Sequence, residues 1–245
     1  MIGNKKILCV ITARAGSRGI PGKNYKKLLG FPLFWWSVEA GLKSGYVDVV
    51  AISSNCKECK KIYDMMLRDS KYSDVIWIER PYKYATPFSK NEEAMLHAAQ
   101  KIIDDSGFYP DVLINLQPTS PCRVNNLLDQ CIEAYYEGDH DSLLTGYKET
   151  PFIWQKIDGR WEYTVDENCC KRKMRQEFDE SEFIYHDNGS VYITDYKVMF
   201  DTGCRIGYNP IVFETTGMCS IQVDTENDFQ LIKKFVEIED LESLI

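Results

Sequence analysis

Hydrophobic positions in the first half of the chain alternate between two patterns. Short, β-branched apolar runs of strand length are separated by longer stretches with apolar residues at helical spacing. Runs that are apolar on both faces suit a parallel sheet that is covered by helices on both sides. The runs predicted as strands span residues 7–11, 47–53, 75–78 and 112–117, and the predicted crossover helices span 32–44, 57–68, 91–105 and 124–137. This alternation predicts an α/β sandwich with a mostly parallel central sheet.

The pattern changes in the second half of the chain. Residues 154–183 are polar, aromatic and rich in charge, without helical periodicity, which predicts an excursion from the sheet. Two further strands, 190–193 and 220–223, are predicted after it, and a terminal helix begins at Thr225 with a capping box. No repeat and no Gly/Ser-rich linker interrupts the chain. We therefore expect a single domain, 1–245, with an inserted lobe at about 152–182.

Composition and charge narrow the classes of partner. The chain has 245 residues with 44% hydrophobic and 27% charged content, enough for one globular domain. Its 29 basic and 37 acidic residues give a formal net charge of −8, and no run of Lys or Arg forms a basic stripe. We expect no nucleic-acid partner. The apolar run of the first strand is too short for a signal peptide or a membrane span, so we expect a cytoplasmic protein without a membrane partner.

Cysteine and histidine spacing predicts neither disulfides nor a metal centre built on these residues. The nine cysteines are odd in number and irregularly spaced, as in proteins of a reducing compartment. Cys56 and Cys59 have a C-x-x-C spacing, but no second pair completes a zinc site. His97, His140 and His186 lie far apart, without metal-binding spacing.

The segment 13–24, ARAGSRGIPGKN, is a glycine-rich basic loop directly after the first predicted strand. Such a loop lies at the carboxyl edge of the sheet, where α/β folds bind ligands. Its glycines, Gly16, Gly19 and Gly22, let backbone N–H groups approach phosphate oxygens, and its cations are Arg14, Arg18 and Lys23. The loop is not a Walker A motif, because Asn24 follows the lysine where Ser or Thr is needed. It predicts a polyphosphate ligand.

This loop resembles the nucleotide-binding signature of the acylneuraminate and ketodeoxyoctulosonate cytidylyltransferases, the CMP-sugar synthetases. Further blocks resemble the same family in the same order: LQPTSPCR at 116–123, RQ at 175–176 with NGSVYI at 188–193, and SIQVDTENDF at 220–229. Together the blocks span most of the chain. The resemblance implies a Rossmann-like nucleotidyltransferase sandwich with a small inserted dimerisation lobe, and hence a homodimer.

The resemblance also implies roles for single residues. Arg14, Ser17 and Lys23 match positions that hold the triphosphate, and Arg14 and Lys23 would stabilise charge on the α-phosphorus and on the leaving pyrophosphate. The predicted nucleotide-binding set is Arg14, Ala15, Gly16, Ser17, Lys23, Asn24, Arg80 and Asn91. Gln117 matches a residue that holds the acceptor sugar, and Arg175 matches an arginine that pairs with the sugar carboxylate.

The predicted metal site departs from the family pattern. The family's D-x-D supplies carboxylates for Mg²⁺, a hard cation that prefers oxygen ligands, and here the first position is Gln222. Asp224 is the carboxylate that remains. An amide oxygen can still ligate Mg²⁺ or a coordinated water, but it contributes no charge, so Gln222 is a doubtful ligand.

These observations predict a magnesium-dependent transfer of CMP from CTP to an acidic 2-keto sugar, of the sialic acid-like nonulosonate or ketodeoxyoctulosonate type, with release of pyrophosphate. The anomeric hydroxyl would attack the α-phosphorus in line, and no side chain is identified as the general base. Two alternatives stay open. One is a nucleotidyltransferase of the same fold that acts on a phosphonate or a sugar phosphate, and the other is a catalytically silent nucleotide-binding homologue.

Overall fold

The structure is a computed structural model, and it describes residues 5–17, 19–164 and 172–237. In this part of the chain, one large sheet has the strand order β11-β7-β10-β6-β1-β4-β5. Its strands are β1 (Ile7–Thr12), β4 (Val49–Ser54), β5 (Ile76–Glu79), β6 (Val112–Asn115), β7 (Ser142–Glu149), β10 (Ile184–Asp195) and β11 (Pro210–Glu214). Every strand predicted in the first half of the chain is confirmed within a few residues at its ends.

Parallel pairing dominates the sheet, as predicted. β6, β1, β4 and β5 form a continuous parallel block, and β11 is parallel to β7. The long strand β10 runs antiparallel to both of its neighbours, β6 and β7. The carboxyl ends of β1, β4, β5 and β6 therefore meet at one edge, and this edge is where a ligand site is expected.

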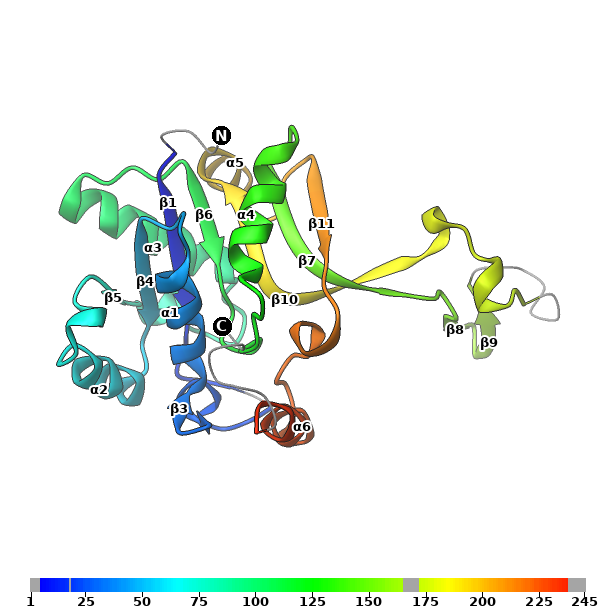
Figure 1. Cartoon of the computed structure of the whole chain (residues 1–245), viewed down its shortest axis with the longest axis horizontal. Helices are drawn as coiled ribbons and strands as arrows, with labels where there is room; N and C mark the ends of the chain where they lie inside the picture. Colours follow the sequence, from blue (N-terminus) through cyan, green and yellow to red (C-terminus); the bar gives the residue numbers. More distant parts are fainter. Residues whose placement is uncertain (1–4, 18, 165–171, 238–245) are drawn as a thin grey trace.

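Helices cover both faces of the sheet, and alternate residues of β1 show why (Figure 1). Ile7, Cys9 and Ile11 pack into the core on the α1 and α4 face, whereas Leu8 and Val10 pack against α3 and α5. Period-two alternation in a strand buried on both sides explains its uninterrupted apolar sequence. The helices are α1 (Leu33–Lys43), α2 (Lys57–Met66), α3 (Asn91–Ser106), α4 (Leu127–Glu137), α5 (Tyr196–Thr202) and α6 (Glu226–Val236).

The return of the chain to the sheet differs from the prediction in one element. Residues 220–223 do not form the predicted strand: a short 3-10 helix, Gly217–Ser220, leads into an extended segment. Val223 N of this segment donates to Thr119 O at 2.7 Å, but the segment joins no strand ladder. The predicted terminal helix is confirmed, because Thr225 caps α6 in a capping box with Asp228.

An arm projects from the body of the molecule where β7 and β10 continue beyond the sheet (Figure 1). It carries the hairpin of β8 (Trp154–Ile157) and β9 (Arg160–Tyr163). A second small hairpin, β2 (Lys27–Leu28) with β3 (Phe31–Pro32), follows the glycine-rich loop. Most of the predicted lobe, 152–182, lies in the arm, and residues 165–171 of it lie outside the described residues. The division into one domain with a lobe stays a prediction.

Candidate active site

The glycine-rich loop is anchored at both ends by hydrogen bonds. Ala13 N donates to Ser53 O at 3.0 Å, and the Asn24 amide donates to Arg14 O at 2.9 Å. Gly22 has a φ of +70°, and a Cβ built there would lie 2.5 Å from the Tyr25 ring. Only glycine combines this conformation with this close approach. These hydrogen bonds tie the start of the loop to β4 and close its two ends on each other.

A cavity of about 490 Å³ opens beside this loop, at the carboxyl edge of the sheet. Its volume falls within the range of small-molecule sites, roughly 300–1,000 Å³. The lining residues are Thr12, Arg14, Gly16, Ser17, Gly19, Lys23, Asn24, Arg80, Ser89, Asn91, Gln117, Pro118, Thr119 and Asp224. Most of the residues predicted from the sequence thus come together in one place, although they derive from five separate segments of the chain.

Two guanidinium groups give the cavity its positive charge. Arg80 is buried, and its Nε donates to Ser53 Oγ at 3.0 Å, while Arg14 Nη1 donates to Thr86 O at 2.6 Å. Burial, and then the nearby charge of Arg14, lower the pKa of Arg80 to about 10. Neither guanidinium forms an ion pair with any residue that the structure describes. Two close cations without a carboxylate partner favour an anionic ligand.

The third cation of the cavity, Lys23, contacts the predicted metal ligand. Lys23 Nζ donates to Val223 O at 2.8 Å and to Asp224 Oδ1 at 3.0 Å. The lysine side chain is 12% exposed, whereas that of Asp224 is 61% exposed and remains open to further ligands. A Cβ on Gly19 would lie 2.1 Å from Asp224 O, so the loop packs directly on this residue. Loop and carboxylate therefore form one unit.

Asp224 fits a magnesium ion that arrives with a nucleotide. Mg²⁺ in nucleotide sites is usually held by one or two carboxylates, with phosphate oxygens and waters as its other ligands. Asp224 is the carboxylate among the cavity-lining residues. Within the described residues, no cluster of three or more His, Cys, Asp or Glu side chains could hold a metal ion by itself. The donor set thus suits a metal that is shared with a phosphate ligand.

A buried arginine fixes the far wall of the cavity, where Gln117 lies. Arg123 Nη2 donates to Gln117 O at 2.9 Å, and its Nε donates to Ser190 O at 3.0 Å. Arg123 is 1% exposed, and burial lowers the pKa of its guanidinium to about 10. By donating to carbonyl oxygens on both sides, this cation links the end of β6 to β10. Gln117 is thereby presented on a rigid backbone.

Some predicted residues lie outside the cavity lining. Ala15 N donates to Asn55 Oδ1 at 2.9 Å, and this bond links the loop to the residue that follows β4. Gln222 lies against Gly189, close to Gln117. Arg175 belongs to a short exposed 3-10 helix of the arm, Arg175–Glu177, and no described residue of the arm lines the cavity. Arg18 lies outside the described residues.

Other cavity residues were not predicted from the sequence. Thr12 is the last residue of β1, and Ser89 precedes α3. Pro118 and Thr119 belong to the LQPTSPCR block, which follows a buried strand. Residues in this position lie at the carboxyl edge of the sheet, so the sequence did contain a signal for them. Ser89 had no such signal, since it lies in an irregular segment between β5 and α3.

The described cysteines are free, and most of them are buried. Burial raises the pKa of Cys59 and raises that of Cys122 to about 12, so neither thiol has thiolate character. None of the helices described here is both long and apolar enough to cross a membrane.

The sequence of the chain is similar to those of known cytidylyltransferases. A model described as cytidylyltransferase matches residues 8–68, the segment with the glycine-rich loop. The chain is 28% identical over 240 residues to the CMP-N,N'-diacetyllegionaminic acid synthase of Legionella pneumophila, covering 95% of this chain and 97% of that protein. It is 24% identical over 236 residues to N-acylneuraminate cytidylyltransferase A of Danio rerio, covering 95% of this chain and 51% of that protein. The resemblance to the cytidylyltransferases is confirmed.

A solved structure shows the same fold. CMP:2-keto-3-deoxy-manno-octonic acid synthetase, complexed with CTP, superimposes with a TM-score of 0.65 at 14% identity, covering 96% of this chain and 100% of that chain. The α/β sandwich is thus a cytidylyltransferase fold, as predicted. The chain spans about half the length of the zebrafish relative that it matches.

Proposed function

We propose that this chain transfers CMP from CTP to an acidic 2-keto sugar and releases pyrophosphate. The observation that carries the proposal is the cation set of the cavity: Arg14, Lys23 and Arg80 converge on one hollow, and the two arginines have no carboxylate partner among the described residues. A triphosphate supplies the missing negative charge. The relatives named above support a cytidine nucleotide and an acidic sugar as the two substrates.

In the proposed reaction, the anomeric hydroxyl oxygen of the sugar attacks the α-phosphorus of CTP. A new O–P bond forms as the bond between the α-phosphorus and the bridging oxygen breaks, and pyrophosphate leaves with the bonding electron pair. Arg14 and Lys23 stabilise the charge that develops on the phosphate oxygens. Catalysis is electrostatic and positional. The proton of the hydroxyl passes to a general base, a role that we assign to no side chain.

Magnesium is part of this proposal. Asp224 would hold the ion together with phosphate oxygens, and the ion would supply positive charge for the leaving pyrophosphate. The Lys23 ammonium that contacts Asp224 is placed to contact the same phosphates, since both residues line one cavity. We expect chelation of magnesium to abolish turnover.

We also propose that the chain acts as a homodimer in the cytoplasm. The arm exposes apolar side chains, among them Ile153, Trp154, Ile157 and Trp161, with Trp161 67% exposed. Trp154 and Trp161 lie on the same face of the β8–β9 hairpin, and exposed apolar surface of this kind is typical of protein interfaces. Arg175 is on this arm, away from the cavity of its own chain, so it can reach an acceptor only in the cavity of a second copy. Free buried cysteines suit a reducing compartment.

The test is pyrophosphate release with each of the common nucleoside triphosphates and a panel of acceptors. The panel contains an N-acylneuraminic acid, N,N'-diacetyllegionaminic acid, 2-keto-3-deoxy-manno-octonic acid, a sugar phosphate and a phosphonate. We expect turnover with CTP and an acidic 2-keto sugar, and little turnover with ATP or GTP. Turnover with the sugar phosphate or the phosphonate alone would replace the proposed acceptor class, and equal turnover with GTP would contradict the proposed nucleotide.

A further inference from the structure

Two glutamine side chains meet above a glycine at the acceptor end of the cavity. A Cβ built on Gly189 would lie 2.5 Å from Nε2 of Gln222 and 2.9 Å from Oε1 of Gln117. The two amides therefore pack side by side on a backbone that carries no side chain. Gln117 lines the cavity, so Gln222 lies at the edge of the same wall.

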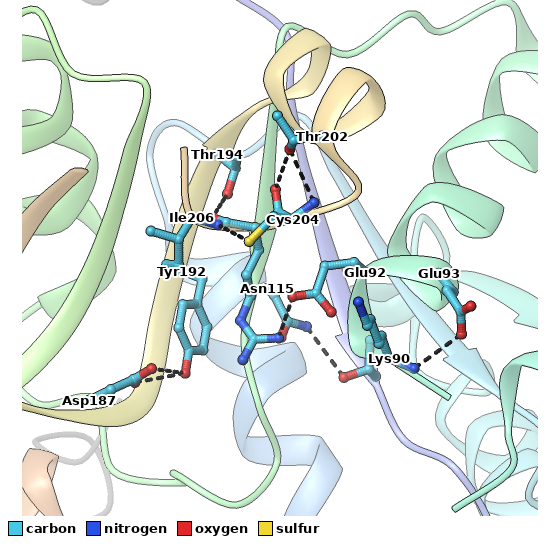
Figure 2. Close-up of polar contacts among 12 residues, drawn as sticks. Lys90, Glu92, Glu93, Asn115, Asp187, Tyr192, Thr194, Thr202, Cys204 and Ile206 are labelled. Carbon is cyan, nitrogen blue, oxygen red and sulfur yellow. Dashed lines mark hydrogen bonds and ion pairs between the residues drawn. The ribbon is translucent and has the colours of Figure 1, made fainter. Parts of the chain in front are cut away.

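A hydrogen-bonded network holds Gly189 in this place. Gly189 has a φ of +64°, and its N–H donates to Asp187 Oδ1 at 2.9 Å. The same carboxylate accepts from the Tyr192 hydroxyl, at 2.7 and 2.8 Å to its two oxygens (Figure 2). The β10 ladder shifts register between Asp187 and Tyr192, so this clamp closes a bulge.

The clamp is in turn packed against the start of α3. The Arg205 guanidinium lies 4.3 Å from the centre of the Tyr192 ring, and its Nη1 donates to Glu92 Oε1 at 2.9 Å. Figure 2 shows the Tyr192 side chain with Asp187 on one side and Glu92 on the other. Glu92 is adjacent to Asn91, which lines the cavity. The bulge that carries Gly189 is thereby linked to the start of α3.

Gln222 and Asp224 have different surroundings, although both flank the buried Val223. Asp224 contacts Lys23 and the glycine-rich loop, whereas Gln222 contacts Gly189 and Gln117. The Gln222 side chain has no hydrogen-bond partner among the described residues. A half-buried amide with unused donors and acceptors, beside a second amide in a cavity wall, suits a polar ligand.

We propose that Gln222 binds the acceptor sugar together with Gln117, and that it does not ligate magnesium. This inference rests on the proposed function. The two amides bind a neutral polar group of the sugar, such as a hydroxyl or an acylamino group, because an amide both donates and accepts. Magnesium is then left to Asp224 and the nucleotide.

The first experiment is Gln222→Asp, which introduces the carboxylate of the family pattern. We expect KM for the acidic sugar to rise by about tenfold, comparable to one lost hydrogen bond. CTP binding measured by calorimetry without acceptor, over a titration of Mg²⁺, should be unchanged. If the variant needs less Mg²⁺ to bind CTP while KM for the sugar stays the same, position 222 belongs to the metal and the inference is wrong. Because calorimetry needs no acceptor, it tests whether position 222 affects the metal even if no acidic sugar is turned over, and the lack of turnover would instead refute the proposed function.

The second experiment compares two glycines of similar backbone conformation. Gly189→Ala and Gly107→Ala both place a methyl group on a left-handed residue, but a Cβ on Gly107 meets nothing within 4 Å. We expect Gly189→Ala to raise KM for the acceptor by about tenfold or more through displacement of the two amides, with KM for CTP unchanged. Gly107→Ala should lower the melting temperature alone. Equal kinetic constants in both variants would contradict an acceptor role for the amide pair.

Discussion

The glycine-rich loop and the arm carry arginines and lysines predicted for the same reaction, yet their surroundings differ. Loop cations converge on one cavity, and the backbone around them is fixed by hydrogen bonds to neighbouring strands. On the arm, Arg175 is exposed and lies on an element that contributes no described residue to that cavity (Figure 1).

This difference suggests that the nucleotide and the acceptor sugar are bound by different parts of the molecule. In the proposed function the nucleotide half lies within one chain, since Arg14, Lys23, Arg80 and Asp224 all line the same hollow. The acceptor half has the wall of Gln117 and Gln222, and the lining cations that the structure describes, Arg14, Lys23 and Arg80, are those assigned to the nucleotide. In this account, the arm of a second copy supplies the cation.

The largest expected effect is in the nucleotide half, with Lys23→Ala. Removing one preorganised cation should lower kcat by about 10²-fold or more, because Lys23 lies where charge develops on the phosphates. Steady-state kinetics of pyrophosphate release measures this effect. Lys27→Ala, an exposed lysine just beyond the loop, is the matched control and should retain activity. Wild-type kcat in Lys23→Ala at saturating CTP would show that the loop does not hold the phosphates.

A smaller and more selective effect is expected on the arm, with Arg175→Lys. A planar guanidinium gives a carboxylate two parallel hydrogen bonds that an ammonium cannot reproduce, so acceptor use should fall by about 10- to 100-fold. CTP binding should barely change. The control is Arg160→Lys, another exposed arginine of the arm. If the two variants have the same acceptor kinetics, or if KM for CTP worsens instead, Arg175 does not bind the carboxylate.

The smallest expected effect is on the melting temperature. It compares the segment that carries Asp224 with the arm. Thr225 Oγ1 accepts from Asp228 N at 3.3 Å in the cap of α6, directly after Asp224. Thr225→Ala should cost about 1 kcal/mol, or about 2–4 °C in the melting temperature. Thr164→Ala in the arm removes an exposed hydroxyl that donates to Ile153 O at 3.2 Å, and it should shift the melting temperature by less because this bond is open to water. Equal shifts in calorimetric scans would mean that the cap does not stabilise the segment carrying Asp224.

Local sequence patterns predicted the parallel half of the fold because β1, β4 and β6 are buried on both faces and read as apolar runs. Strand β7, with the sequence SLLTGYKE, mixes polar and apolar residues and gave no such signal. The strand predicted at 220–223 was wrong because this segment has a strand-like pattern but no neighbouring strand to pair with. Ile221 and Val223 have a strand-like spacing, but the bond from Val223 N to Thr119 O belongs to no strand ladder.

The same contrast holds for the site. Arg14 and Lys23 were predicted because one short basic loop places them together, and Asn24 was predicted from the resemblance of that loop to the family signature. The position of Gln222 beside Gly189 depends on a contact between segments far apart in sequence and on a bulge in β10. No local pattern encodes that contact, so the sequence assigned Gln222 by its alignment with a metal-binding position, and not by its neighbours.

The most direct test of this division of labour is complementation between two inactive variants. Lys23→Ala breaks the nucleotide half and keeps a functional arm, whereas Arg175→Ala breaks the arm and keeps the nucleotide half. When the two are co-expressed and purified together, we predict recovery to about a quarter of wild-type activity, because random pairing leaves one intact site in half of the dimers. Co-expression of Lys23→Ala with Arg14→Ala, both in the same half, should give no recovery. If the first pair also shows no more activity than its separate members, the arm does not complete the site of a second copy, and the central claim is wrong.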